Sequence, residues 1–339
     1  MRTALTYDDV LLVPQYSEIR SRTEVNLTSN LDSKRTLNLP IISSPMDTVT
    51  ESDMAYHMWD HGALGIIHRY NSIKEQASQV AELTQSLGVD SIIAAAVGIT
   101  GDFFERAQAL VKNGASVICL DVAHGHHILM QEALISLKMQ FNSDVHVMAG
   151  NVATKKGFND LADWGADSVR CNIGGGSICS TRIQTGHGLP GLQTIMDCAE
   201  SDRDAKIIAD GGLRTSGDIV KALAAGADFV MLGSLLAGTD EAPGETIDTS
   251  KGIKKKYRGM ASKDAQMVWR GRFSSDEGIS TLIDSKGSVD TILSGLRKGI
   301  VSGLSYSGAR TIHELQSKAD WVRQSGAGLR ESYTHILLR

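Results

Sequence analysis

A glycine-rich segment that ends in a cysteine is the part of this sequence best suited to covalent chemistry. Residues 174–182 read GGGSICSTR, so Cys179 is followed closely by Thr181 and Arg182. An accessible loop, a following helix N-terminus and a nearby guanidinium group all favour the thiolate form of a cysteine. The segment therefore predicts a nucleophilic Cys179, with a small buried core residue as the alternative.

The other cysteines show no pattern of this kind. Cys119, Cys171 and Cys198 form no C-x-x-C pair with each other or with Cys179, so a metal cluster is not expected. We interpret these three residues as small hydrophobic core residues with free thiols, as in a reducing compartment.

Two groups of glycines have the composition of an anion site. The first is residues 174–177, and the second combines residues 211–212 with residues 233–234. Glycine lets backbone N–H groups approach a phosphate closely, although a glycine pair is more often an ordinary turn. Neither group matches a Rossmann fingerprint or a P-loop. We expect a phosphate site because the second group follows the last two strands of the barrel described next.

Eight short apolar runs alternate with amphipathic stretches along the chain. Runs without polar alternation are typical of parallel strands that are buried on both faces. Eight such units predict an α/β fold, a (β/α)8 or TIM barrel, rather than a doubly wound open sheet. The expected strands are residues 39–43, 64–68, 91–95, 117–121, 145–149, 168–171, 206–210 and 229–233.

Polar side chains follow nearly all of these runs. In a barrel the carboxyl ends of all strands lie on one face, where active sites form. Polar residues after so many successive strands therefore predict a single site. They are Ser44, Asp47, His68, Asp121, His124, Asn151, Arg170, Asp210 and Ser234.

Residues 238–290 interrupt the strand and helix alternation. They are polar and contain glycines, which predicts a lid or binding loop on the C-terminal face, with an active-site flap inside it. The lysine run at residues 254–256 is interpreted as a solvated face rather than a binding patch.

Composition limits the classes of function. The chain has 339 residues, 42% hydrophobic residues and a formal net charge of -5, so no basic surface favours nucleic acid. No apolar run reaches the roughly 20 residues that cross a bilayer. Residues 1–15 lack the pattern of a signal peptide. We expect a cytoplasmic protein with a small-molecule substrate and neither nucleic-acid nor membrane partners.

The sequence resembles the IMP dehydrogenase and GMP reductase family over nearly its whole length. Besides the cysteine loop, six segments carry the resemblance. They are LTYDDVLLVP at residues 5–14, SSPMDTVTE at 43–51, GNVAT at 150–154, IADGG at 208–212, VMLGS at 230–234 and YRGM at 257–260.

The resemblance implies a role for each matching residue. Cys179 attacks C2 of a purine nucleoside 5'-monophosphate, with Thr181 and Glu277 in the same catalytic machinery. Asp121 and Asn151 face the nicotinamide riboside of the cofactor, and Arg170 lies between the two ligands. The substrate-binding set is Ser44, Met46, Ser177, Asp210, Gly212, Gly233, Ser234, Tyr257, Gly259 and Met260.

The family divides into two reactions. The dehydrogenase oxidises IMP to XMP with NAD+, for guanine nucleotide synthesis, and hydrolyses a thioimidate on the cysteine. The reductase converts GMP to IMP and ammonia with NADPH. Residues 121–126, 237–245 and 326–332 resemble the dehydrogenase, and reductases usually carry Asn at the position of His124. We therefore expect an IMP dehydrogenase, with a GMP reductase and a non-catalytic nucleotide-binding barrel as alternatives.

The flap resembles a reductase instead. Residues 261–276 are few, and dehydrogenases carry an Arg-Tyr pair there whose Arg activates water. This chain offers Arg272 before Phe273, with Arg270 as a second candidate. A surface arginine on a mobile lid is the alternative for Arg272.

The resemblance of the tail, residues 326–332, implies a cation and a partner subunit. In the dehydrogenases it lends carbonyl oxygens to a monovalent cation, K+, held by the cysteine loop of a neighbouring subunit. We expect a homotetramer. The expected donors are Gly174, Gly176 and Cys179, with Glu331, Ser332 and Tyr333 from the neighbour.

Three departures from the family pattern affect the cofactor and regulation. Asn172 replaces a usual Gly, and Arg69 replaces a usual Lys, which leaves both NAD and NADP open. The family's CBS regulatory modules normally follow strand two. Here residues 70–90 leave room for one helix, so we expect a single catalytic domain over residues 1–339 without that insert.

Overall fold

The chain folds around a closed barrel of parallel strands, as expected from the eight apolar runs. The computed structural model describes residues 1–274 and 276–334. Within these residues the strand order is β4-β5-β6-β7-β8-β9-β10-β11, and β11 pairs with β4 to close the ring. The strands are β4 (Ile41–Ser43), β5 (Leu64–Ile67), β6 (Ala94–Val97), β7 (Val117–Asp121), β8 (His146–Val152), β9 (Ser168–Cys171), β10 (Lys206–Asp210) and β11 (Phe229–Leu232).

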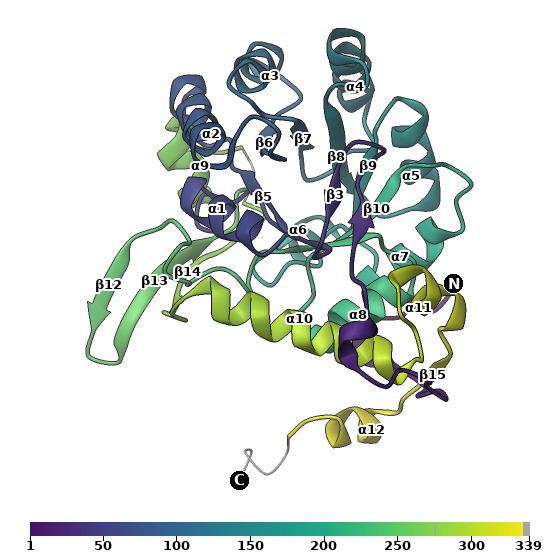
Figure 1. Cartoon of the computed structure of the whole chain (residues 1–339). Coiled ribbons are helices and arrows are strands. Elements are labelled where there is room, and N and C mark those ends of the chain that lie inside the picture. Colours follow the sequence, from purple (N-terminus) through teal and green to yellow (C-terminus); the bar gives the residue numbers. More distant parts are fainter. Residues whose placement is uncertain (275, 335–339) are drawn as a thin grey trace.

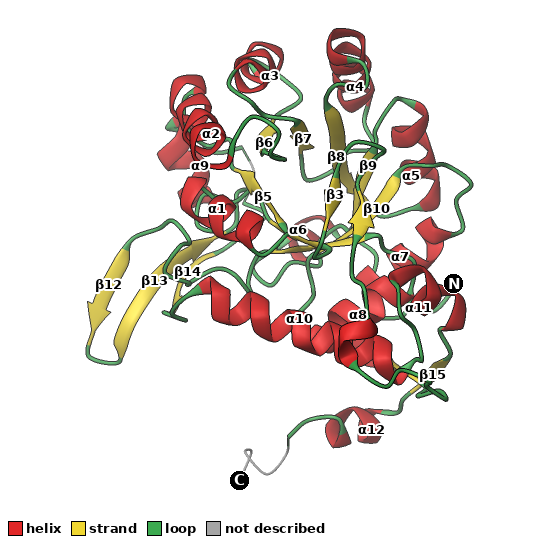
Figure 2. Ribbon diagram, viewed as in Figure 1, coloured by secondary structure: helices red, strands yellow, loops and turns green. Residues whose placement is uncertain are grey.

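Helices surround this ring (Figures 1 and 2). The helices that follow barrel strands are α1 (Ser52–Asp60), α2 (Ile73–Leu87), α3 (Phe103–Lys112), α4 (Ile128–Phe141), α5 (Lys155–Asp163), α6 (Thr181–Thr185), α7 (Gly191–Ala199) and α8 (Ser216–Ala224). Three of them, α2, α5 and α8, begin with a Ser or Thr whose side chain accepts a backbone N–H, as Ser72 does from Glu75 and Thr215 from Asp218.

Each barrel strand is buried on both faces. In β5, Ile66 belongs to the cluster inside the barrel, whereas Ile67 packs in the larger cluster between the strands and the helices. The inner cluster also contains Leu31 and Leu37, which belong to the short hairpin formed by β2 (Ser29–Asn30) and β3 (Thr36–Leu37). This double burial explains why the strands read as continuous apolar runs.

Three expectations about element boundaries need correction. Strand β8 runs to Val152, three residues past its expected end. Strand β6 begins at Ala94, three residues after the expected start, although the expected run does reach it. Residues 238–290 are not a simple loop: they contain an antiparallel sheet of β12 (Thr246–Thr249), β13 (Gly252–Arg258) and β14 (Ser280–Asp284), with helix α9 (Lys263–Arg270) between the last two strands.

The lysine run is not a solvated face either. It lies in β13, where Lys255 is buried and its ammonium group donates to the carbonyl oxygens of Thr239 and Ala242. A buried ammonium group requires such acceptors, because burial favours the neutral form and lowers the pKa of Lys255. The sequence run alone gave no sign that one of its lysines points inward.

The remaining elements lie at the two ends of the chain. Strand β1 (Val10–Leu12) pairs with β15 (Trp321–Arg323) and so joins both ends of the chain. Helices α10 (Val289–Tyr306) and α11 (Ile312–Lys318) pack on the barrel beside α8, and α12 (Gly326–Glu331) extends away from it (Figure 1). Short 3-10 helices occupy Tyr7–Asp9 and Arg22–Glu24. No described helix is long and apolar enough to span a bilayer.

Candidate active site

A cavity of about 260 Å³ opens at the carboxyl ends of the barrel strands. It brings together most of the residues expected at the site, which come from segments spread between β4 and β14. The predicted residues that line it are Ser44, Met46, Asp121, Asn151, Arg170, Gly174, Gly176, Ser177, Cys179, Thr181, Asp210, Gly212, Gly233, Ser234, Tyr257, Gly259, Met260 and Glu277.

The cysteine loop leads from β9 into helix α6. Cys179 is partly exposed, and its thiol lies 3.1 Å from the hydroxyl oxygen of Thr181, the first residue of α6. The flap returns beside this loop: the Ser180 N–H donates to the Glu277 carbonyl at 3.1 Å, and the Ile279 N–H donates to the Ile178 carbonyl at 3.0 Å. These backbone bonds bring Glu277 to the cysteine, although almost 100 residues separate the two in sequence.

An ion-pair network crosses the floor of the cavity. Arg170 pairs with Asp210 at 2.9 Å on one side and with Asp121 on the other. Burial alone would lower the pKa of Arg170, but the two carboxylates hold it well above the ordinary value. Burial would likewise raise the pKa of Asp121, yet Arg170 and Arg69 outweigh burial and lower it. Arg170 and Asp121 are therefore held in their charged forms.

Asn151 and Asn172 complete this network. The Asn151 side-chain amide donates to the Asp210 carboxylate at 2.7 Å and to the Asn172 carbonyl at 3.0 Å. The Asn172 side chain donates to the Asp210 carbonyl at 2.9 Å. Asn172 has φ of 150°, a positive value that suits the usual glycine better. Its amide thus ties the end of β9 to the end of β10 at a position where a glycine could not.

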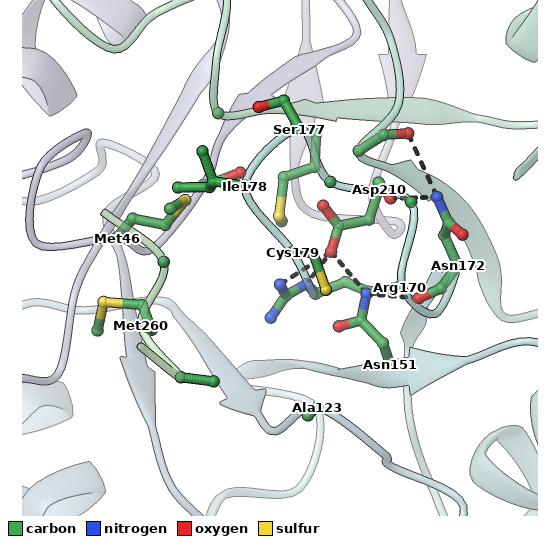
Figure 3. A pocket seen from close by; sticks show the side chains of 18 of the residues that line it. Met46, Ala123, Asn151, Arg170, Asn172, Ser177, Ile178, Cys179, Asp210 and Met260 are labelled. Atoms are coloured by element: carbon green, nitrogen blue, oxygen red, sulfur yellow. Dashed lines mark hydrogen bonds and ion pairs between the residues drawn. The ribbon is translucent and has the colours of Figure 1, made fainter. Parts of the chain in front are cut away.

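The wall opposite this network is apolar. Figure 3 shows Met46 and Met260 on one side of Cys179, and Asp210, Arg170 and Asn151 on the other. Methionine side chains are adaptable and polarizable, and they suit the face of a flat ring. The cavity therefore offers a polar side to a hydroxylated group and an apolar side to a ring.

The glycine segments approach one another at one end of the cavity. Gly212 has φ of 77°, and a methyl group there would lie 3.2 Å from the Gly175 carbonyl oxygen. A methyl group on Gly233 would lie 3.3 Å from the hydroxyl of buried Tyr257. Burial also raises the pKa of Tyr257, so it remains a neutral hydrogen-bonding group. The space between Gly175, Gly212, Gly233 and Tyr257 therefore suits an anion, and we call it the anion cradle.

Some predicted residues do not join the cavity lining. Among the described residues, Arg272 lies on an exposed part of the flap, and Glu331, Ser332 and Tyr333 are exposed at the end of α12. Arg270, the second candidate base, stacks on Trp269 instead. His124 is exposed as well, so it is not part of the lining.

Two other residues at strand ends have structural partners. His68 bonds to Glu51 at 2.9 Å, and Asp47 pairs with Arg258, whose Nε lies 3.0 Å from its carboxylate. Neither lines the described cavity. A polar side chain at a strand end thus does not by itself identify a site residue.

Sequence reasoning missed an aromatic part of the lining. Tyr70 follows β5, lines the cavity, and its hydroxyl donates to the Met260 carbonyl at 2.8 Å. Its ring stacks on Trp269 of α9 with centroids 4.2 Å apart, and Arg69 lies over both rings. The available signal was an aromatic residue two positions after the second strand run.

The closed parallel barrel and its polar cavity place this chain among the (β/α)8-barrel proteins that act on small molecules. A family model described as IMP dehydrogenase / GMP reductase domain matches residues 4–335. The chain therefore belongs to the IMP dehydrogenase / GMP reductase family, a family of oxidoreductases.

Relatives of both kinds are similar to the chain. An inosine-5'-monophosphate dehydrogenase of Nitrosopumilus maritimus is 35% identical, with 99% of each chain covered. A GMP reductase of Leishmania major is 33% identical, with 98% of this chain and 96% of the relative covered. A solved GMP reductase variant of Trypanosoma brucei, in complex with guanosine 5'-monophosphate, has a TM-score of 0.93 at 32% identity and covers 99% of this chain and 98% of its own.

The family's CBS modules have no counterpart between β5 and β6. The alignment with the Nitrosopumilus maritimus enzyme extends over 473 positions, more than the 339 residues of this chain. In this chain, helix α2 (Ile73–Leu87) occupies the connection where the insert was expected. The expected short connection is therefore confirmed.

Proposed function

We propose that this protein is an IMP dehydrogenase, which oxidises IMP to XMP. The observation that carries the proposal is Cys179, whose thiol lies 3.1 Å from Thr181 in a cavity with an anion cradle and an apolar wall. Such a cavity suits a purine ring beside a sulfur nucleophile. The dehydrogenase-like segments at residues 121–126, 237–245 and 326–332 favour oxidation over reduction.

The proposed chemistry begins at Cys179. Its thiolate adds to C2 of IMP, and the hydride on C2 then leaves, so that a thioimidate joins sulfur to the purine. The nicotinamide cofactor, NAD+ in this proposal, supplies the hydride acceptor when it is bound. Water then breaks the sulfur–carbon bond, which releases XMP and restores the thiol. Thr181 and Glu277 are proposed to assist proton transfer in this last step.

The polar network would orient the two ligands. The free oxygen of the Asp210 carboxylate is proposed to accept from the ribose hydroxyls, because Arg170 and Asn151 engage only the other oxygen. Asp121 and Asn151 are proposed to face the nicotinamide riboside. Arg170 would then link both ligand sites through its two carboxylate partners.

The residues around a second cavity suit the adenine and phosphate groups of a dinucleotide cofactor. This space, also about 260 Å³, shares Arg69, Tyr70 and Ala123 with the first cavity. The Tyr70 and Trp269 rings suit stacking on adenine, and Arg69 and Arg270 suit phosphate groups. The same positive charges leave NADP+ as an alternative to NAD+.

A monovalent cation fits the chemistry of the loop and tail. Helix α12 ends at Glu331, and the last carbonyl groups of a helix have no partner within it. We propose that Glu331, Ser332 and Tyr333 of one subunit, with Gly174, Gly176 and Cys179 of a neighbour, hold K+ through backbone oxygens. The cation would order the cysteine loop in a homotetramer.

GMP reductase is the second candidate. The flap favours it, because Arg272, the candidate water-activating base, is exposed and lies outside the described cavity lining. A reductase needs no such base. The similar identities to a dehydrogenase and a reductase, 35% and 33%, do not separate the two reactions.

Absorbance of the reduced nicotinamide distinguishes the two reactions. Purified protein in K+ buffer is mixed with IMP and NAD+ or NADP+, and in parallel with GMP and NADPH. An increase with IMP supports the dehydrogenase, and XMP should form in equal amount. A decrease with GMP instead supports the reductase, and no change in either mixture contradicts both.

A further inference from the structure

A cluster of histidines and carboxylates lies on the outside of the barrel, where α1, α10 and the segment after β11 meet. The His57 Nδ1 atom lies 2.9 Å from an Asp290 carboxylate oxygen, and the His61 Nε2 atom lies 3.2 Å from the same oxygen. Glu241 lies beside them. None of these residues is in the described lining of the cavity around Cys179.

The distances in this cluster approach those of a metal site. One ligand atom each from His57, Glu241 and Asp290 lies within 4.8 Å of the others. Tetrahedral zinc has bonds of about 2.0–2.2 Å, which place its ligand atoms about 3.3 Å apart. Side-chain movements of about 1 Å would therefore bring these atoms to a common ion.

Three backbone elements hold the cluster in place. His57 and His61 are four residues apart on α1, so they lie on one face of the helix. Asp290 is in the first turn of α10. One oxygen of the Glu241 carboxylate accepts the Val289 N–H at 2.8 Å, which leaves its second oxygen for another partner.

The surroundings also resemble the outer shell of a metal site. The second ring nitrogen of His57 lies 3.9 Å from an Asp53 carboxylate oxygen. Metal-bound histidines usually donate their other N–H to such a carboxylate. The side chains of His57 and His61 are 28% and 20% exposed and that of Asp290 is 47% exposed, so the cluster is partly buried and open on the Asp290 side.

We propose that His57, Glu241 and Asp290, whose ligand atoms lie within 4.8 Å of one another, bind a divalent transition-metal ion. His61, which contacts Asp290, would move to become the fourth ligand, and Zn²⁺ is the best match for two imidazoles and two carboxylates. The ion is structural and ties α1 to α10. Its two positive charges compensate the two carboxylates. Helix α1 follows the loop after β4, and α10 follows the sheet of β12, β13 and β14. The ion therefore links two parts of the chain that contribute to the active site.

Isothermal titration with Zn²⁺ tests this proposal in a Cys179→Ser background, since the reactive thiol could itself bind zinc. We expect one ion per chain, with a dissociation constant in the micromolar range or below. Thermal unfolding should shift upward by a few degrees with Zn²⁺, and a chelator should reverse the shift. The His57→Gln/His61→Gln double variant should lose both effects.

His313→Gln is the matched control, because His313 is an exposed residue of α11 and lies outside the cluster. This variant should keep the stoichiometry and the thermal shift. Zinc binding that survives unchanged in the His57→Gln/His61→Gln variant would overturn the proposal. So would the lack of a binding event in the Cys179→Ser protein.

Two further measurements do not depend on the double variant. Asp290→Asn preserves the side-chain shape and should weaken Zn²⁺ binding at least tenfold. Co²⁺ added to the Cys179→Ser protein should give the intense visible absorption of a four-coordinate site. A weak spectrum typical of six-coordinate Co²⁺, with unchanged affinity in Asp290→Asn, would contradict the assigned ligands.

Discussion

Cys119, Cys171 and Cys198 are buried, whereas Cys179 is partly exposed on its loop. Burial raises the pKa of Cys119 to about 12 and that of Cys171 well above its ordinary value. A thiol must be both accessible and deprotonated to act as a nucleophile. At the scale of single residues, exposure therefore separates the candidate nucleophile from the structural cysteines.

This difference predicts the outcome of alkylation and mutation. Iodoacetamide should modify Cys179 first in the folded protein, as mass spectrometry of peptides can show, and IMP should protect it. Cys179→Ala should lose turnover but keep IMP binding by calorimetry. A Cys179→Ala variant that remains active would rule out the covalent mechanism.

Gly233 supports a second prediction, on the anion cradle. In Gly233→Ala the added methyl group would lie 3.3 Å from both the Tyr257 hydroxyl and the Met46 sulfur. We expect KM for the nucleotide to rise about tenfold, or ~1.4 kcal/mol, with little change in melting temperature.

Gly217→Ala on α8 is the control, since its methyl group would only meet the Thr215 hydroxyl at an ordinary 3.5 Å. Steady-state kinetics of both variants measure KM for the nucleotide. Equal KM values for Gly233→Ala and the unmodified protein would show that the cradle lies elsewhere.

The flap is the element in which the two candidate reactions differ. Its helix α9 is held by Asp264, which pairs with Lys256 and Arg258 of β13. The hydrogen bond from Lys256 outweighs partial burial and lowers the pKa of Asp264 to about 2. Its charge therefore favours the docked flap above its ordinary pKa, and this contribution is lost only as pH falls through about 2.

Arg272 and Arg270 allow a direct test of the flap. If Arg272 activates water, Arg272→Gln should slow hydrolysis about 100-fold, while the first turnover still reduces NAD+ in a rapid burst. Arg270→Gln, which removes a proposed phosphate contact, should instead raise KM for NAD+ and leave the rate of hydrolysis unchanged. Stopped-flow absorbance separates the burst from the steady state. If neither variant slows hydrolysis, Arg272 is not the base.

At the scale of the whole molecule, the tail has its proposed partners outside its own chain. Its residues are exposed at the end of α12 and do not line the described cavity. In contrast, the β1 and β15 pair and Gln324, which donates to the Asp8 carbonyl, lie before the tail and close the fold. The tail can therefore be removed without cutting these contacts.

A chain that ends at Gln324 should fold and still bind IMP, but its turnover should fall at least tenfold. The full chain should lose similar activity when Na+ or Li+ replaces K+. Activity assays in each salt, with light scattering for the oligomeric state, test both effects. A truncated chain that is fully active and independent of K+ would exclude the proposed cation site.

The barrel could be predicted from the sequence because its strands are buried on both faces. Each strand such as β7 or β11 then reads as an apolar run, and eight runs with helices between them allow few other folds. Because the barrel strands are parallel, their carboxyl ends lie on one face of the barrel. Most of the expected site residues therefore meet in one cavity.

Tertiary structure alone decided how the side chains pair. Arg170 lies between Asp121 and Asp210 because barrel closure sets the distance between β7, β9 and β10. Glu277 reaches the cysteine loop through backbone hydrogen bonds that no local sequence pattern predicts. Lys255 points inward and Arg272 outward for the same reason: the direction of a side chain depends on contacts with residues far away in sequence.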